Sequence, residues 1–257
     1  MEKRMVSYPY PNQNIVSSIL DDVLRSVSGV SSVGTISQAQ AVKYAQNRGK
    51  GFQLFDWEMH KDVGNLHFFK YGNTDSQGVC GYGTNNYQKV TGLTNALGIR
   101  DTVSYYKEKG GSNPQAEGAY RDGVNYQSVN VLGYENFQGN KAEWLQYVTV
   151  NKTAADGRWF ITMPDGTERV VQGITVYNAD IYPTHMVWGR YMDLIAAKEG
   201  GSSSSHWFDR FYVGTGLSRV VYRSSYNAHA LGGVSYANAN NDSSNTNANI
   251  GVRLANN

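Results

Sequence analysis

The sequence predicts a domain of the α+β class, in which helices come early in the chain and short strands come later. Apolar residues at helical spacing and helix-capping residues fall before Gly72. Beyond Gly72, the residue types Gly, Asn, Ser and Asp interrupt the chain every few residues and leave runs suited to strands. Helices and strands that are segregated along the chain in this way are typical of α+β domains.

Length and composition exclude several other classes of protein. The chain has 257 residues, of which 40% are apolar and 12% aromatic, enough to bury a packed core rather than remain disordered. A single cysteine, Cys80, excludes a disulfide scaffold. The net charge of +2, without a basic cluster, argues against nucleic-acid binding. The N-terminal residues MEKRMVSYPYPNQN contain no apolar run, so we expect neither a secretory signal nor insertion in a membrane.

The N-terminal region has the spacing of an amphipathic helix over residues 12–29, with Asn14 available as its cap. The apolar residues of this stripe are Val16, Leu20, Val23 and Val27. We expect the helix either to pack on its own domain or to serve in oligomerisation, as in a homotrimer, or in attachment to a larger particle. Gly, Ser and Val dominate residues 29–35, which suggests a linker. The predicted division is therefore residues 1–35 as helix and linker, and residues 36–257 as the main domain.

Two further helices have clear start and stop signals. One is predicted to begin at Ser37 and to stop at Gly49. The next has Asp56 as its N-cap and Gly72 as its end, and the short apolar run at residues 52–55 between the two helices reads as a strand.

The strongest strand signal is a hairpin around Pro164-Asp165-Gly166, which separates two segments of strand composition, residues 159–163 and 169–171. Shorter strands are predicted at residues 129–132, 219–222 and 250–254.

The tail that begins at Val220 is dense in Asn, Ser, Tyr and Ala and has almost no charge. It could form surface loops around its strands, because Asn and Ser favour turns. It could also be an Asn tract that is prone to form amyloid. A third interpretation is a recognition surface, since Tyr, Ser, Gly and Asn are the residues of adaptable binding loops.

Two segments resemble a known family. Residues 132–140, LGYENFQGN, followed by Glu143 and Trp144, resemble the G-x-E-[ND]-[aromatic]-x-G-N-x-x-E-W motif of C-type-lectin-like domains. These domains are shared by formylglycine-generating enzymes and by the variable proteins of diversity-generating retroelements. The second segment is Gly232-Gly233-Val234 with its Asn-rich tail ending in GVRL, and it resembles the C-terminal variable region of the retroelement proteins.

The resemblance covers most of residues 36–255 and implies a C-type-lectin-like fold for residues 36–257. In such domains the glycines of the motif allow tight turns, its Asn and Glu satisfy loop backbone, and its Trp fills the core. This chain has Lys141 and Ala142 where family members often have an apolar residue and an aromatic one, so we expect different local packing there.

An enzymatic role is not expected. The formylglycine-generating branch of the family uses a pair of cysteines and copper, whereas this chain has only Cys80, which we interpret as a small packed residue. No G-x-S-x-G motif supports a serine hydrolase, and no His spacing supports a metal site. We therefore predict no catalytic residue, no metal and no cofactor.

Similarity to the retroelement proteins instead implies a ligand-binding surface, diversified over about residues 206–240. Tyr and Trp supply contact area at low entropic cost, and Asn, Ser and His adapt their hydrogen bonds. The predicted ligand-binding residues are Trp207, Asp209, Phe211, Tyr212, Tyr222, Ser225, Tyr226, Asn227, His229, Leu231, Tyr236 and Asn238. We interpret Gly232, Gly233, Gly251 and Leu254 as scaffold.

The function that these observations predict is a phage tail component on the virion that binds a protein or glycan on the surface of a bacterial host. One alternative is a bacterial adhesin displayed on the cell surface, which would need an export route. A second alternative is a virion part whose Asn-rich end merely solvates a tip. An oxidase of the formylglycine-generating type is the least favoured.

Overall fold

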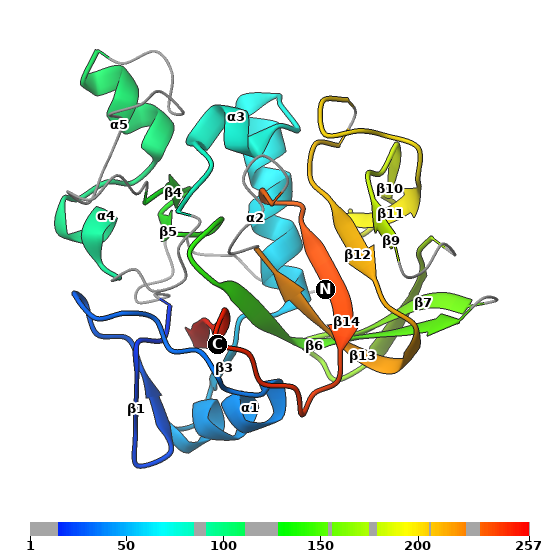
Figure 1. The fold of residues 1–257 in the computed structure, drawn as a ribbon, viewed down its shortest axis with the longest axis horizontal. Coiled ribbons are helices and arrows are strands. Elements are labelled where there is room, and N and C mark those ends of the chain that lie inside the picture. The colour runs from blue at the N-terminus through cyan, green and yellow to red at the C-terminus, as the bar shows by residue number, and fades with distance from the viewer. Residues whose placement is uncertain are drawn as a thin grey trace.

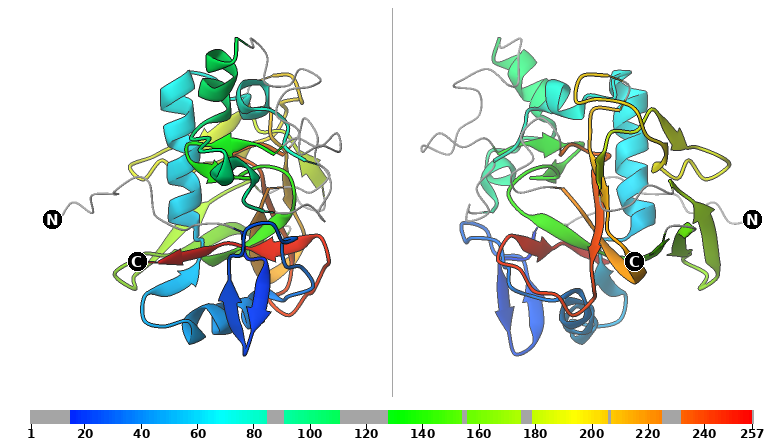
Figure 2. Two further views of the ribbon diagram at one scale, coloured as in Figure 1. Left: turned by 90° about the vertical axis from the view of Figure 1, so that its left-hand side faces the viewer. Right: turned by 45° about the vertical axis from the view of Figure 1, so that its right-hand side comes forward.

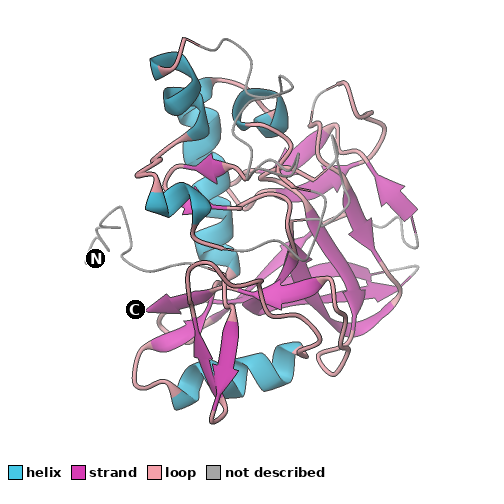
Figure 3. Ribbon diagram, turned by 60° about the vertical axis from the view of Figure 1, so that its left-hand side comes forward, coloured by secondary structure: helices cyan, strands magenta, loops and turns pink. Residues whose placement is uncertain are grey.

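The structure is a computed structural model that describes residues 15–84, 91–110, 128–153, 156–174, 179–205, 207–224 and 232–256. It has few helices and one large sheet, so the α+β class predicted from the sequence is confirmed (Figure 1). The strands of the large sheet gather on one side of the molecule, and the long helix α2 (Trp57–Tyr71) lies on the other (Figure 3).

The large sheet has eight strands in the order β8-β7-β6-β13-β14-β12-β9, with β15 paired to β6 beside this path. Its strands are β6 (Ala142–Thr153), β7 (Asp156–Thr162), β8 (Glu168–Gln172), β9 (Ala179–Ile181), β12 (Phe211–Val213), β13 (Gly216–Arg223), β14 (Ala237–Asn241) and β15 (Ile250–Val252). The pairs β12·β14 and β15·β6 are parallel and the others are antiparallel. The Asn-rich tail therefore contributes interior strands rather than only surface loops.

Within the described residues, four two-stranded sheets accompany the large one. They consist of β1 (Ser18–Leu20) with β2 (Val23–Arg25), β3 (Phe52–Leu54) with β16 (Leu254–Asn256), β4 (Asn130–Val131) with β5 (Tyr134–Glu135), and β10 (His185–Val187) with β11 (Ile195–Lys198).

The two predicted central helices are confirmed. Helix α1 (Gln38–Asn47) begins after Ser37, whose side chain forms a capping box with Gln40. Helix α2 begins after Asp56, whose carboxylate accepts the N–H of Met59, and it ends at Gly72 in the left-handed conformation with φ of 62°. Three short helices that follow were not predicted: α3 (Ser76–Cys80), α4 (Leu93–Ala96) and α5 (Thr102–Glu108).

The predicted N-terminal helix is wrong over its described residues, which form the hairpin β1–β2. Asp21 and Asp22 both have positive φ, 52° and 57°, which is the backbone of a tight two-residue hairpin turn. In the hairpin the four apolar residues share no face, because Val16 is buried whereas Leu20 and Val27 are exposed. Residues 12–14 lie outside the described part of the chain.

The hairpin is packed on the main domain, and the residues predicted as a linker, 29–35, are also bonded to it, since the N–H of Thr35 donates to the carbonyl of Asn247 at 2.8 Å. The N–H of Val16 donates to the carbonyl of Val252 at 3.0 Å, and Arg48 Nη1 donates to the carbonyl of Leu24 at 2.9 Å. Val16 and Leu24 belong to a buried cluster that includes Trp144. Residues 15–35 are thus packed on the main domain, at the same end of the molecule as α1 (Figure 2).

The predicted hairpin is confirmed, since β7 and β8 pair antiparallel on either side of Pro164-Asp165-Gly166. The core has two parts. One lies between α2 and the large sheet, where Trp57 and Trp159 pack with ring centroids 4.9 Å apart. The other surrounds Trp144, which is fully buried as the motif predicts. Within the described residues, none of the helices has the length and apolar character needed to span a bilayer.

Candidate functional site

The motif at residues 132–140 supports loop backbone through its glutamate. Both carboxylate oxygens of the buried Glu135 accept backbone N–H groups at 2.6 Å, from Gly92 and from Thr94, at the beginning of α4. The asparagines act differently from the expectation. Asn136 and Asn140 are buried with φ of 49° and 66°, and their side-chain amides form no hydrogen bond among the described residues. Their contribution is a left-handed backbone, which Asn tolerates better than most residues.

A buried ionic cluster joins this motif to the C-terminal strands. The carboxylate of Glu143 accepts hydrogen bonds from Arg223 and Arg253, and the Arg253 Nη2 bond to Oε1 is 2.9 Å long. The two guanidinium groups also donate to motif carbonyls, Arg223 Nη1 to Phe137 at 2.5 Å and Arg253 Nη2 to Glu135 at 2.8 Å. Burial lowers the pKa of Arg223, an effect that the neighbouring Glu143 opposes. We call Glu143, Arg223 and Arg253 the ionic cluster.

Sequence reasoning assigned no role to these two arginines, which lie 80 and 110 residues after Glu143 in the chain. The sequence signal that could have identified them is a charged residue within a run of apolar strand residues. Each sits among strand residues, and buried charges are almost always paired.

A second buried network fixes the backbone of residues 232–235. Their four N–H groups donate, in order, to side-chain oxygens of Gln77, Asp209, Ser76 and again Asp209, over 3.1, 2.6, 2.9 and 2.9 Å. Side-chain partners for four successive N–H groups satisfy a segment that has no strand neighbour there. We call residues 232–235 with Ser76, Gln77 and Asp209 the backbone clamp.

Gly233 is required at its position in the backbone clamp. A Cβ atom on this residue would collide with Ser76 Oγ and with the Asp209 carboxylate. Gln138 of the motif also supports the clamp. Ser76 Oγ donates to Gln138 Oε1 at 3.1 Å, and Gln138 Nε2 donates to the carbonyl of Gly81. The prediction that Gly233 is scaffold therefore has a direct steric reason.

The carboxylate of Asp209 is fully enclosed. Burial raises the pKa of Asp209 to about 6, although the hydrogen bonds from Ser235 and Gly233 act in the opposite direction. A third donor, Ser235 Oγ, lies 2.7 Å from Oδ2. Asp209 therefore organises the chain rather than facing outward.

Five of the twelve predicted ligand-binding residues lie outside the described residues, and all five belong to residues 225–231. They are Ser225, Tyr226, Asn227, His229 and Leu231. The described residues on both sides are fixed. Before the segment, Ser224 Oγ donates to the carbonyl of Gly139 at 3.3 Å, next to Arg223 of the ionic cluster. The backbone clamp begins directly after it.

The expectation of an exposed surface is wrong for five of the remaining seven residues, because their side chains are buried. They are Trp207, Asp209, Phe211, Tyr236 and Asn238. The physical reason is that these side chains bond or pack inside the fold: Asp209 accepts the N–H groups of Gly233 and Ser235, and the ring centroid of Trp207 lies 5.0 Å from that of Phe68. Tyr236, for example, accepts a hydrogen bond from Asn238 Nδ2 at 3.3 Å.

Tyr212 and Tyr222 are half-buried. The ring of Tyr222 meets Trp144 edge-on, with centroids 5.5 Å apart, so it also supports the core.

Cys80 is buried, as its interpretation as a small packed residue predicts. Its Sγ lies 3.6 Å from His67 Nε2. Burial raises the pKa of Cys80 to about 12 and lowers the pKa of His67 to about 4, so both groups are neutral at pH 7. A neutral pair lacks the thiolate that nucleophilic chemistry needs. Across the described residues, no group of three His, Cys, Asp or Glu side chains is placed to hold a metal ion.

Lys141 explains one departure from the family motif. Its Nζ donates to the carbonyl of Ala248 at 2.6 Å and so ties the Asn-rich tail to the beginning of β6. Burial lowers the pKa of Lys141 to about 8. The contact that Lys141 makes is therefore a polar one.

No protein-family model matches this chain, and a search of curated proteins found no similar sequence.

Proposed function

We propose that this protein is a non-enzymatic binding protein with a C-type-lectin-like fold, related to the variable proteins of diversity-generating retroelements. Its recognition residues lie in and next to residues 225–231. In this proposal it serves as a receptor-binding component of a phage tail, and its ligand is a protein or glycan on the surface of a bacterial host. The observation that carries the proposal is the pair of buried polar networks on either side of this segment.

A binding segment that changes its sequence must not carry the stability of the fold. The ionic cluster and the backbone clamp keep these two tasks apart. Their members lie outside residues 225–231, and they bond backbone atoms or each other. The segment itself contains Tyr226, Asn227 and His229, residue types that supply contact area and adaptable hydrogen bonds. Fixed ends also reduce the entropy that a loop loses on binding.

The motif supports the C-type-lectin-like part of the proposal. Glu135 holds loop backbone, Trp144 fills the core and donates from Nε1 to the carbonyl of Ile36 at 2.9 Å, and Gln138 supports the backbone clamp. These are the kinds of structural role that the resemblance implies for the motif.

The test uses the purified full-length chain, labelled with a fluorophore, and intact cells from a panel of bacterial species. We expect saturable binding to at least one species. Combined replacement of Tyr226, Asn227 and His229 by Ala should reduce binding at least about tenfold, because a few anchors carry most of the binding energy. The melting temperature should stay within about 2 °C.

The matched control is Arg100→Gln, which changes an exposed residue on another part of the surface. It should leave binding unchanged. If the triple variant binds the cells as tightly as the parent chain does, the proposed recognition segment is wrong. If the parent chain binds no species of a broad panel, the assignment of a bacterial surface ligand is wrong.

A further inference from the structure

The turn that follows β10 presents two aromatic rings and one cation to solvent. Trp188 is 37% exposed and Tyr191 is 41% exposed, and the side chain of Arg190 between them is also exposed. The turn shares no residue with the segment 225–231, so substitutions in the two regions can be tested separately.

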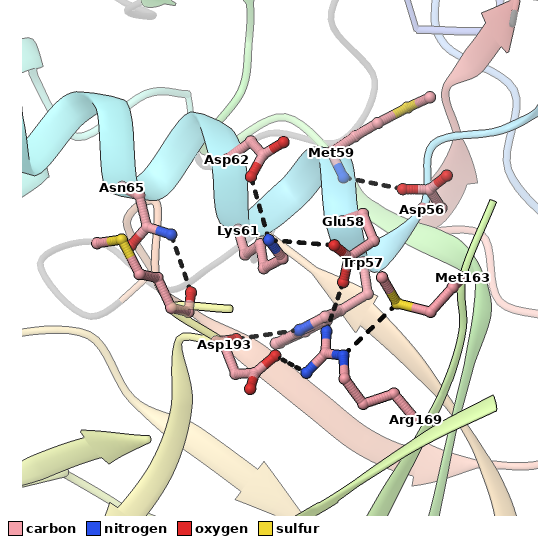
Figure 4. Close-up of polar contacts among 11 residues, drawn as sticks. Asp56, Trp57, Glu58, Met59, Lys61, Asp62, Asn65, Met163, Arg169 and Asp193 are labelled. Atoms are coloured by element: carbon pink, nitrogen blue, oxygen red, sulfur yellow. Dashed lines mark hydrogen bonds and ion pairs between the residues drawn. The ribbon is translucent and has the colours of Figure 1, made fainter. Parts of the chain in front are cut away.

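The backbone of the turn is strained and is held by helix α2. Met192 and Leu194 have positive φ, 52° and 53°, which costs free energy for residues other than Gly. Asn65 Nδ2 donates to the carbonyl of Met192 at 2.9 Å, and Trp57 Nε1 donates to the carbonyl of Asp193 at 3.1 Å (Figure 4). Strain that the surrounding structure maintains in this way clusters at functional sites.

Charged residues beneath the turn are already neutralised by one another. Arg169 bonds the carboxylates of Asp193 and of Glu58, the latter at 2.6 Å, and Lys61 lies 3.1 Å from Glu58 (Figure 4). The guanidinium of Arg169 lies 4.4 Å from the ring centroid of Tyr191. Arg169 therefore supports the ring of Tyr191 from the protein side and is not available to a ligand.

Trp188 is supported in the same manner by aromatic residues. Its ring centroid lies 5.4 Å from that of the buried Trp207, which in turn lies 5.0 Å from that of Phe68 on α2. This packing fixes the plane of the indole. Its Nε1–H forms no hydrogen bond with any described residue, so it can donate to a ligand.

Arg190 is the exposed charged residue of the turn. Among the described residues it forms no ion pair, and its guanidinium lies 5.7 Å from the ring centroid of Tyr191. An exposed guanidinium beside the ring of Tyr191 and two residues from Trp188 in the chain is complementary to an anionic group attached to a ring with an apolar face.

We propose that this turn binds an anionic sugar. The C–H face of a pyranose ring stacks on the indole of Trp188, whose π face is negative. The carboxylate or phosphate of the sugar accepts hydrogen bonds from Arg190. The phenol of Tyr191 and the indole N–H bond its hydroxyls. Three side chains of one turn match a sugar better than a protein partner, since a standard protein interface uses about 20–30 residues on each side.

The test titrates the full-length chain with methyl β-D-glucuronide and with methyl β-D-glucoside, which differ only at C6. Binding is followed by saturation-transfer difference NMR and tryptophan fluorescence. We expect a Kd of about 1 mM for the acid and a Kd at least about tenfold weaker for the neutral sugar. Glucose 6-phosphate is a third probe, and its affinity relative to the glucuronide shows which anionic group the turn prefers. The preference for the acid should fall as salt is added.

Variants separate the two contacts. Trp188→Ala should weaken binding of both methyl glycosides at least about tenfold, whereas Arg190→Gln should abolish the preference for the acid and leave the weak binding of the neutral sugar. Arg100→Gln removes the same charge elsewhere, and Phe69→Ala removes an exposed ring outside the turn; both should bind as the parent chain does.

Equal affinity for the acidic and neutral sugars would overturn the proposal. So would an Arg190→Gln variant that retains the preference, or no saturable binding of any of the three probes at about 50 mM. Replacement of Tyr226 by Ala should leave sugar binding unchanged, so failure here and failure of the proposed recognition segment are distinguishable.

Discussion

The backbone clamp and the turn at residues 188–194 are held in similar ways, but they differ in how much of their side chains they expose. Both are irregular stretches whose backbone is held by side chains from other elements, from α3 and Asp209 for the clamp and from α2 for the turn. In the clamp, the held residues are themselves buried, whereas the turn exposes Trp188, Arg190 and Tyr191. Aromatic and polar composition alone therefore does not separate residues that support a site from residues that can contact a ligand.

A substitution in the ionic cluster should cause the largest loss of stability. Glu143→Gln removes the charge that both arginines share and leaves two buried guanidinium groups without their carboxylate partner. We expect a loss of about 3–5 kcal/mol in the free energy of unfolding. Chemical denaturation at pH 7 measures it. As the comparison on the exposed turn, Arg190→Gln should change stability by less than about 0.5 kcal/mol. Similar losses in the two variants would contradict the distinction.

Two tyrosines give the next contrast. Tyr236 is 2% exposed, so Tyr236→Ala should cost about 3–4 kcal/mol through the cavity that it leaves. Tyr191 is 41% exposed, and Tyr191→Ala should cost about 1 kcal/mol or less. Thermal unfolding of the two variants, measured side by side, gives the two losses of stability. A Tyr236→Ala variant as stable as the parent chain would return this residue to the candidate recognition surface.

The pH dependence of the clamp depends on Asp209. Its pKa of about 6 in the folded chain lies above the ordinary value of 3.8, so the folded chain holds this proton more tightly than the unfolded chain. The stabilisation from this group is therefore full below about pH 4 and is lost as pH rises through 6, by about 3 kcal/mol. Subtracting the stability of Asp209→Asn from that of the parent chain isolates the effect. A difference that stays constant from pH 4 to pH 7 would show that burial does not control this group.

Two glycines provide the smallest contrast. Gly233→Ala should cost about 2 kcal/mol or more, because its Cβ collides with Ser76 and Asp209. Gly189, at the exposed turn, has φ of 44° and open space around it, so Gly189→Ala should cost only the backbone strain of about 1–2 kcal/mol. Urea midpoints of the two variants provide the measurement. A greater loss in Gly189→Ala than in Gly233→Ala would mean that the clamp is loosely packed.

Local signals in the sequence predicted the parts of the fold that local interactions determine. Asp56 and Gly72 marked both ends of α2, and Pro164-Asp165-Gly166 marked the hairpin β7–β8. These features need only residues within one or two turns of the chain.

Features that depend on distant partners could not be predicted in this way. The spacing from Val16 to Val27 matches a helix, yet Val16 pairs with Val252 near the other end of the sequence. The backbone clamp joins Gly232 to Gln77, which are 155 residues apart. Tyr236 and Asn238 have the composition of a binding loop, but both side chains are buried, and Asn238 lies on β14, which pairs with β13 inside the sheet.

We expect the networks around residues 225–231, and not the segment itself, to carry the stability of the fold. The most direct measurement is protease resistance of two display libraries, one with residues 225–231 randomised and one with residues 232–235 randomised. We predict that most members of the first library stay folded and that few members of the second do. Equal fractions of folded members in the two libraries would contradict the claim.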